Sequence, residues 1–168
     1  MNCCEYDKKQ EIYSVLSRLK IPFTVIDHPA AGTMEECNAI GKQLGVSICK
    51  NLFLCNRQKT KFYLLLMPGD KEFRTKDLSA QIGSSRLSFA APEDMERLLN
   101  TAPGSASVLG LLYDRDCCVQ LLIDRDLLKN EYFGCHPCIN TSSIRFRTED
   151  LLTRFLPNSG HTAIYVTL

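Results

Sequence analysis

Two short apolar runs joined by a polar link constrain the fold of this chain most. The first run is Lys50-Asn51-Leu52-Phe53-Leu54, and the second is Phe62-Tyr63-Leu64-Leu65-Leu66-Met67. Between them lies Asn56-Arg57-Gln58-Lys59-Thr60. Apolar runs of this length, bounded by turn residues, are typical of buried strands. The sequence therefore predicts a hairpin that pairs strands 49–55 and 61–67.

Lys50 is the unexpected residue of this hairpin. It stands at the head of an apolar strand, where an unpaired buried ammonium group would be costly. Either the methylene stem lies along the apolar surface and carries the ammonium group to water, or the ammonium group binds an anion. Both interpretations stay open at this point.

The remaining pattern predicts helices and strands mixed with hairpins, without a regular βαβ array. We expect helices over residues 7–20, after Thr33, over 75–82, from Pro92 to Leu99, and from a Thr148 cap to Phe155. We expect further strands at 21–26, 119–123, 144–146 and 164–166. The fold class is mixed α/β: one compact domain over residues 1–168, with a mixed, largely antiparallel curved sheet surrounded by helices.

Composition limits the possible partners and compartments. The 168 residues carry 20 Lys plus Arg against 19 Asp plus Glu, so no global basic surface indicates a general nucleic-acid binder. No stretch approaches the length of a membrane span, and the N-terminus does not resemble a signal peptide. The nine cysteines are odd in number and include adjacent pairs, a poor disulfide framework. We expect a soluble cytoplasmic protein with reduced thiols.

A second candidate site, after Lys50, is the segment Cys135-His136-Pro137-Cys138-Ile139-Asn140. The His136 imidazole can donate, accept or carry charge near neutral pH, and Asn140 offers a donor and an acceptor. Together they could orient a water or a sugar hydroxyl. The alternative is a structural turn in which both side chains bond to the backbone.

Other polar residues have simpler interpretations. His28 is either a second functional histidine or the end of a strand, and His161 is expected to be exposed. Two acidic segments, Asp114-Arg115-Asp116 and Asp124-Arg125-Asp126, are expected to be solvated turns around strand 119–123.

Cys135 and Cys138 have the spacing of a zinc or redox pair. A structural zinc site needs four ligands, and the other close pair, Cys117-Cys118, lacks the spacing. A redox pair would open a helix after a strand, which this segment does not clearly do. We therefore expect no metal and no cofactor.

Six segments, in this order, resemble the YbaK/ProX-type aminoacyl-tRNA deacylases, the family of the prolyl-tRNA synthetase editing domain. The resemblance covers about residues 8–156, and the free-standing ProX/PrdX-type branch is the most similar. The segments are Lys50–Leu54, Tyr63–Leu65, Arg86–Ala90, Pro103–Ser105, Gly110–Leu112 and His136–Thr141.

The resemblance implies a YbaK/ProX-like fold and hydrolysis of the ester that links a wrong amino acid to tRNA. The expected substrate is the 3′ acceptor end of alanine-charged tRNA for proline. Such editing has a physical reason, because a synthetase pocket cannot strongly reject an amino acid smaller than its own. Prolyl-tRNA synthetase or an elongation factor is the further partner expected, with no DNA and no membrane.

The resemblance also implies roles for individual residues. Lys50 would hold the phosphate or ribose of the terminal adenosine, and the Gly104 loop would polarise the scissile carbonyl as an oxyanion hole does. His136 would position the adenosine or a water. Water would attack, oriented by the 2′-hydroxyl of the substrate. The remaining substrate-binding candidates are Asn51, Ser105, Asn140 and His28.

Two departures from the family pattern leave alternatives open. Val108 stands where proline is usual, and Tyr113 stands where asparagine often precedes the aspartate that matches Asp114. The amino acid specificity could differ as a result. A non-catalytic module that binds the tRNA acceptor end or an adenosine ligand is the second hypothesis. A zinc or redox protein built on Cys135 and Cys138 is the third.

Overall fold

The computed structural model describes residues 3–31 and 33–168. The helices are α1 (Cys3–Arg18), α2 (Met34–Leu44), α3 (Thr75–Gln81), α4 (Pro92–Leu99), α5 (Thr148–Asp150) and α6 (Leu156–Ser159), the 3-10 helices η1 (Val108–Leu112) and η2 (Arg125–Lys129), and the π-helix η3 (Leu151–Phe155). The strands are β1 (Phe23–Asp27), β2 (Lys50–Asn56), β3 (Phe62–Met67), β4 (Leu87–Phe89), β5 (Val119–Asp124), β6 (Tyr132–Cys135), β7 (Ser142–Arg147) and β8 (Ala163–Val166).

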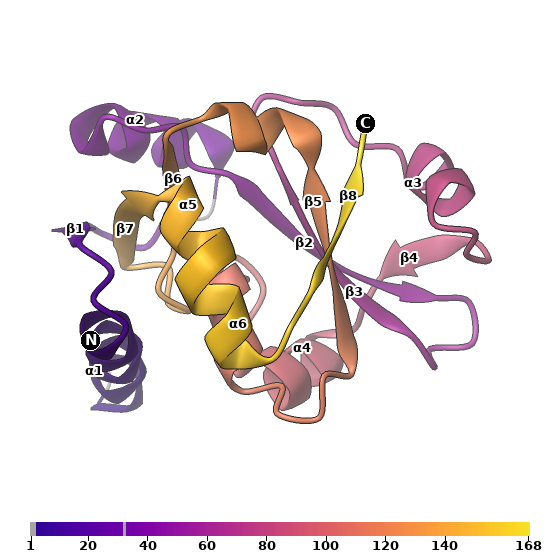
Figure 1. Cartoon of the computed structure of the whole chain (residues 1–168), viewed down its shortest axis with the longest axis horizontal. Coiled ribbons are helices and arrows are strands. Elements are labelled where there is room, and N and C mark those ends of the chain that lie inside the picture. Colours follow the sequence, from indigo (N-terminus) through magenta and orange to yellow (C-terminus); the bar gives the residue numbers. More distant parts are fainter. Residues whose placement is uncertain (1–2, 32) are drawn as a thin grey trace.

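The predicted mixed α/β class is confirmed, with the described strands divided between two sheets instead of one. An antiparallel sheet has the order β1-β7-β6, and a mixed sheet has the order β4-β2-β3-β5-β8. In the mixed sheet β5 runs parallel to both β3 and β8. Figure 1 shows the antiparallel sheet beside α2 at one end of the molecule and the mixed sheet at the other.

The predicted hairpin is confirmed as the centre of the mixed sheet. β2 and β3 pair antiparallel from Lys50 opposite Met67 to Cys55 opposite Phe62. Every residue of β3 is buried, because both faces of the sheet are covered. Phe53 packs into the core on one face, and Leu54 packs into a second cluster on the other face.

The two sheets meet near the start of β2. Ile48 forms a parallel bridge with Gly134 of β6, and the Cys49 amide donates to the Gly134 carbonyl at 3.0 Å. This approach needs a glycine: a Cβ on Gly134 would lie 2.7 Å from Val46 Cγ1. The N-terminal end of β2 is therefore fixed against the second sheet.

Helix α2 begins as predicted. The Thr33 hydroxyl accepts from the Glu36 amide at 3.3 Å, and the Glu36 carboxylate accepts from the Thr33 amide at 3.0 Å, which forms a capping box. Gly45 ends the helix in the left-handed conformation, with φ of 66°. The helix is thereby placed directly before the Ile48–Gly134 junction.

The predicted Thr148 cap is wrong. Thr148 lies inside the helix, its hydroxyl donates to the Asn130 carbonyl at 2.7 Å, and the capping position is held by Arg147 without a side-chain bond. The helical segment also continues past Phe155, to Ser159, as η3 and α6. A threonine that satisfies a neighbouring carbonyl is no longer available to the helix terminus.

The expectations for His161 and the acidic turns also require correction. His161 is buried, and its Nε2 donates to Asp114 at 3.1 Å. Asp114 also accepts from the Cys118 and Val119 amides. Asp124 is fully buried as well, so both acidic segments begin with a carboxylate that the fold encloses. No helix in the described residues is both long and apolar enough to cross a membrane.

Candidate functional site

A small cavity of about 170 Å³ opens where the two sheets meet. Its wall combines segments that are far apart in the sequence. They are Ala31, Thr33 and Cys37 around α2, residues 48–52 at the start of β2, Gly104 and Ala106 of the loop before η1, and His136 after β6.

Four of the predicted site residues, Lys50, Asn51, Gly104 and His136, line this cavity. Ser105 and Asn140 line a neighbouring space of about 110 Å³ that also includes Lys8. The loop that contains Gly104 separates the two spaces.

Lys50 has a neutral partner. Its ammonium donates to the Lys71 carbonyl at 2.8 Å, and among the described residues it forms no ion pair. The side chain is partly buried. The ammonium group is therefore held at the cavity by a hydrogen bond, while its charge remains available to an anion.

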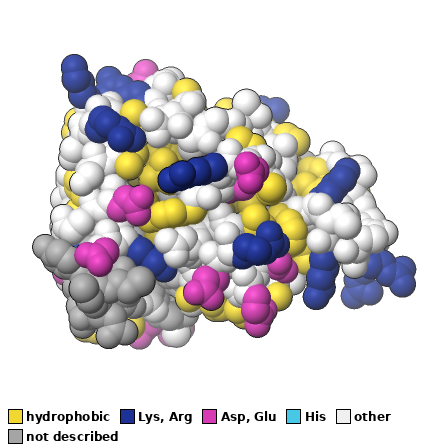
Figure 2. Space-filling view, turned by 90° about the horizontal axis from the view of Figure 1, so that it is seen from below, with side chains coloured by type: hydrophobic (Ala, Val, Ile, Leu, Met, Phe, Trp, Pro, Cys, Tyr) yellow, Lys and Arg dark blue, Asp and Glu magenta, His cyan; other side chains and the backbone are white. Residues whose placement is uncertain are grey.

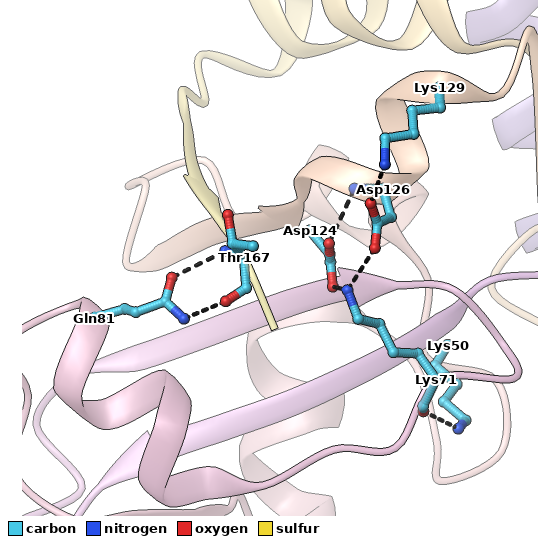
Figure 3. Close-up of polar contacts among 7 residues, drawn as sticks. All are labelled: Lys50, Lys71, Gln81, Asp124, Asp126, Lys129 and Thr167. Carbon is cyan, nitrogen blue, oxygen red and sulfur yellow. Dashed lines mark hydrogen bonds and ion pairs between the residues drawn. The ribbon is translucent and has the colours of Figure 1, made fainter.

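The segment that binds Lys50 is itself anchored by an ion-pair network. The Lys71 ammonium lies 2.8 Å from Asp124 and 2.7 Å from Asp126, and Lys129 also pairs with Asp126 (Figure 3). The side chains of Lys129 and Lys71 lower the pKa of Asp126 to about 2. Burial alone would lower the pKa of Lys71, but hydrogen bonds to both carboxylates outweigh it and raise that pKa. The carbonyl partner of Lys50 thus has a charged anchor at the end of β5.

Asn51 connects β2 to the glycine loop. Its Oδ1 accepts from the Val108 amide at 3.0 Å, and its Nδ2 contacts Cys49 Sγ at 3.2 Å. Val108, which replaces the usual proline, is fully buried and uses the amide that a proline would lack. Asn51 therefore fixes the loop against the start of β2.

The glycine loop contributes two residues, Gly104 and Ala106, to the cavity wall. Gly104 has φ of 84°, a conformation that favours glycine. In the part of the chain that the structure describes, no hydrogen bond uses the amide of Gly104 or of Ala106, and both residues line the cavity. Ser105 closes the turn instead, since its hydroxyl donates to the Ala102 carbonyl and accepts from the Ala102 amide.

His136 is buried and oriented by the backbone. Its Nδ1 lies 2.8 Å from the Ser142 carbonyl, which can only accept, so Nδ1 carries the proton. Burial lowers the pKa of His136, which keeps the ring neutral near pH 7. Nε2 is then an acceptor beside the cavity.

Cys37 contacts that acceptor, and it is not an activated nucleophile. Its Sγ lies 3.9 Å from His136 Nε2. Burial raises the pKa of Cys37, as does the neighbouring Glu36, so the thiol stays protonated. No sequence signal had indicated Cys37 as a cavity residue, because a lone cysteine on a helix has no characteristic spacing.

His28 lies outside the cavity wall but contacts His136 indirectly. The two rings have centroids 5.9 Å apart. His28 Nδ1 donates to the Pro29 carbonyl at 2.7 Å, and its Nε2 lies 2.9 Å from Ser143 Oγ. Ser143 Oγ is also 3.3 Å from His136 Nδ1. His28 therefore supports His136 through Ser143 instead of facing the cavity.

The cysteine pair does not have the features of a redox site. Burial raises the pKa of Cys135 to about 12, and burial also raises the pKa of Cys138. Such thiols are poor nucleophiles at neutral pH. Within residues 3–31 and 33–168, no group of three or more His, Cys, Asp or Glu is arranged to hold a metal ion.

Tyr113, the other departure from the family pattern, is not among the residues that line the cavity. Its hydroxyl donates to Glu11 at 2.8 Å. Burial is the main cause that raises the pKa of Tyr113, and the hydrogen bond to Glu11 is the second. The larger side chain therefore leaves the cavity wall unchanged.

Comparison with known proteins shows the family of the chain. Residues 28–153 match the family model of the aminoacyl-tRNA editing domain. The chain is 32% identical to the prolyl-tRNA editing protein ProX of Acetoanaerobium sticklandii, over 94% of this chain and 96% of that protein. It is 33% identical to prolyl-tRNA synthetase associated domain-containing protein 1 of Bos taurus, over 89% of this chain and 88% of that protein.

Solved structures share the fold. The crystal structure of a candidate trans-editing enzyme for prolyl-tRNA synthetase superposes with a TM-score of 0.70 at 18% identity, covering 96% of this chain and 97% of that chain. A hypothetical protein, APE2540, superposes with a TM-score of 0.69 at 19% identity, covering 92% and 96%.

Proposed function

Because the chain belongs to the aminoacyl-tRNA editing domain family, we propose that it is a trans-editing deacylase. It hydrolyses the ester that links a wrong amino acid to tRNA, without an attached synthetase. The single observation that carries this proposal is the cavity of about 170 Å³ that Lys50, Asn51, Gly104 and His136 line together. It is small and offers a cation, two backbone donors and a neutral acceptor.

Each group has a distinct task in the proposed reaction. The Lys50 ammonium binds a phosphate or ribose oxygen of the terminal adenosine. The amides of Gly104 and Ala106 donate to the carbonyl oxygen of the ester as negative charge develops there. His136 Nε2 accepts from a ribose hydroxyl or a water, since its ring is neutral. Asn51 holds the loop that carries the two amides.

Water is the nucleophile in this scheme. Its oxygen bonds to the ester carbonyl carbon, and the 2′-hydroxyl of the substrate orients it. The bond between that carbon and the ribose oxygen then breaks, a proton passes to the ribose oxygen, and the free amino acid leaves. The protonated states of Cys37 and Cys49 support this scheme, because burial raises the pKa of both thiols that line the cavity and makes them weak nucleophiles.

We propose alanine-charged tRNA for proline as the substrate. Two features support it: the small cavity and the names of the prolyl-tRNA relatives. Ser105 and Asn140, in the neighbouring space, would act as supports of the loop and not as direct ligands. The free thiols suit the reducing cytoplasm, which is where we place the activity.

A partner contributes to tRNA affinity in this proposal. Phosphate contacts dominate binding to nucleic acids, and the near balance of 20 basic and 19 acidic residues leaves few cations to spare. Prolyl-tRNA synthetase or an elongation factor is the proposed partner. Adding either one should lower the KM for charged tRNA and leave kcat unchanged.

The direct test is a deacylation panel. The purified protein is mixed with tRNA charged with alanine, serine, cysteine or proline, and loss of the aminoacyl bond is followed over time. We expect alanine to be released fastest and proline to be retained. Binding without release of any amino acid would replace the deacylase with a non-catalytic binding module.

A further inference from the structure

Phe89 is the most exposed of the large hydrophobic side chains that the structure describes, at 63%. It lies on β4, a three-residue strand at one edge of the mixed sheet. Among the described residues its ring contacts that of Phe73, with centroids 6.4 Å apart and planes at 70°. An edge-on contact of this kind supports the ring and leaves a face of it open.

The strand register places Phe89 next to the cavity. Phe89 pairs with Leu54 of β2, so both side chains point to the same face of the sheet. Lys50 and Leu52 share that face, because alternate residues of a strand point the same way. Leu52 lines the cavity, and it is the diagonal neighbour of Phe89, about 7–8 Å away.

The cavity and the aromatic ring therefore occupy one continuous edge. β4 covers β2 only from Leu54 to Asn56. The earlier residues of β2, from Lys50 to Leu52, face the cavity instead. A ligand that leaves the cavity along this edge meets Phe89 first.

The same end of the molecule carries unpaired cations. Arg57 and Arg86 line a hollow of about 440 Å³ with Ser88, which lies on the face of β4 opposite to Phe89, and no ion pair in the described part of the chain uses either guanidinium. Lys59 and Lys61 are exposed on the adjoining hairpin turn. Figure 2 shows Lys and Arg side chains gathered at the end of the molecule where Figure 1 places this turn.

We propose that Phe89 is a stacking platform for an unpaired nucleotide that precedes the terminal adenosine of the bound tRNA. Arg57 and Arg86 then hold the phosphates on the 5′ side of that nucleotide. This rests on the proposed deacylase function. A flexible single strand suits the surface because any base can stack on an aromatic ring, while cations track the phosphates.

The first experiment compares two substrates in one variant. Phe89→Leu keeps an apolar side chain but removes the ring. With charged tRNA, we expect KM to rise about ten- to hundredfold and kcat to stay unchanged, as the loss of one stacked base predicts. With an aminoacyl-adenosine that lacks the preceding nucleotides, we expect no change in kcat/KM. Equal losses on both substrates, or none on either, would overturn the proposal.

The second experiment does not depend on hydrolysis. Fluorescence anisotropy measures binding of a short single-stranded RNA that ends in cytidine-cytidine-adenosine, and of the same RNA with abasic sites in place of both cytidines. The wild type should prefer the intact RNA, and Phe89→Leu should bind both equally. An equal affinity of the wild type for both would refute the platform even if the deacylation panel succeeds. A preference for the intact RNA would support it even if no ester is hydrolysed.

Matched variants separate stacking from general surface effects. Phe89→Tyr keeps the ring and should restore the preference for intact RNA. Ile164→Ala removes an exposed side chain, at 45%, from β8 at the opposite edge of the same sheet, and should bind as the wild type does. Arg86→Gln should weaken the binding of both RNAs alike. It should also reduce the salt dependence of the binding affinity by the amount expected for about one phosphate contact. If Ile164→Ala weakened binding as much as Phe89→Leu, the loss would be a general surface effect and the stacking proposal would be overturned.

Discussion

At the scale of single residues, Lys50 shows how an energetic oddity becomes a candidate functional group. Two interpretations were open from the sequence, escape to water or an absent anion. The structure gives the ammonium one neutral acceptor, the Lys71 carbonyl. A carbonyl satisfies one donor of the three and neutralises no charge, so the second interpretation is the one that the geometry supports.

Replacing Lys50 tests this role. Lys50→Ala should lower kcat/KM for charged tRNA by about ten- to hundredfold, the range expected for losing one hydrogen bond to a charged group. The fold should persist, because the substitution removes only a partly buried side chain and its one hydrogen bond to a backbone carbonyl. Circular dichroism checks the fold, and Lys42→Ala, an exposed lysine on α2, should retain full activity. Full activity in Lys50→Ala would show that the lysine only solubilises the strand.

His136 predicts a dependence of stability on pH. Burial lowers its pKa in the folded state, so the unfolded chain takes up a proton at a higher pH, near 6.5. The contribution of the neutral ring is therefore complete above about pH 6.5 and is lost as the pH falls toward the folded-state pKa. Urea unfolding from about pH 8 to about pH 5 should show a smaller loss of stability in His136→Gln than in the wild type. Parallel pH profiles would mean that other groups carry the effect.

The limits of sequence-based prediction are clear at this scale. Lys50 stood out because it heads an apolar strand, and His136 stood out because it lies between Cys135 and Pro137 with Asn140 four residues on. Asp124 directly follows an apolar run, and an argument like the one for Lys50 could have identified it as buried. Ser105 and His161 have no such signal, because their partners, Ala102 and Asp114, are defined only by the folded chain.

At the scale of elements, the network at the end of β5 joins three segments. Lys71 lies between β3 and α3, Asp124 ends β5, and Asp126 lies in η2. Gln81 and Thr167, nearby in Figure 3, hold α3 to the C-terminal residues through two backbone–side-chain bonds. The Lys71 carbonyl is therefore fixed by elements that do not touch the cavity.

Asp124→Asn tests the coupling between these elements. Removing the buried charge should cost about 1.5–3 kcal/mol of stability, the range for a charged hydrogen bond. It should also lower kcat/KM several-fold, because Lys50 loses a fixed acceptor. The control is Asp126→Asn, whose side chain is 42% exposed and should matter less. Unchanged kinetics in a destabilised Asp124→Asn protein would limit the network to a structural role.

Regular elements were predicted where one local signal was enough. The hairpin β2–β3 and the helix α4 follow from apolar runs, a polar link and a proline at the helix start. Strand β6 was missed because Tyr132-Phe133-Gly134-Cys135 is short and contains a glycine, which normally weakens a strand. Here the glycine is what lets β6 approach Ile48.

At the scale of the whole molecule, the approach at Gly134 joins the sheets and so forms the cavity. Sequence patterns predicted most of the strands, but not their division into two sheets, because pairing depends on contacts between distant segments. Phe23 of β1 pairs with Phe146 of β7, and no local sequence pattern predicts that strand pairing.

Gly134→Ala should disturb this junction. The added methyl would lie 2.7 Å from Val46 Cγ1 and 3.0 Å from Ile48 Cδ1, so the protein should lose about 1–3 kcal/mol in urea unfolding. Adding Val46→Ala removes the closest atom and should recover part of that loss, although Val46→Ala alone is destabilising. If the stability losses of the two single variants simply add in the double variant, the strain does not come from the contact with Val46.

The pairing of β1 with β7 also sets an order of assembly. The β2–β3 hairpin is local and can form as soon as its own residues are made, whereas β1 must wait for a strand near the other end of the chain. Loop-closure entropy opposes such distant contacts, so they form late. His136 lies between β6 and β7. The cavity therefore cannot be complete until the residues through His136 have been made, and a product truncated before His136 should be inactive.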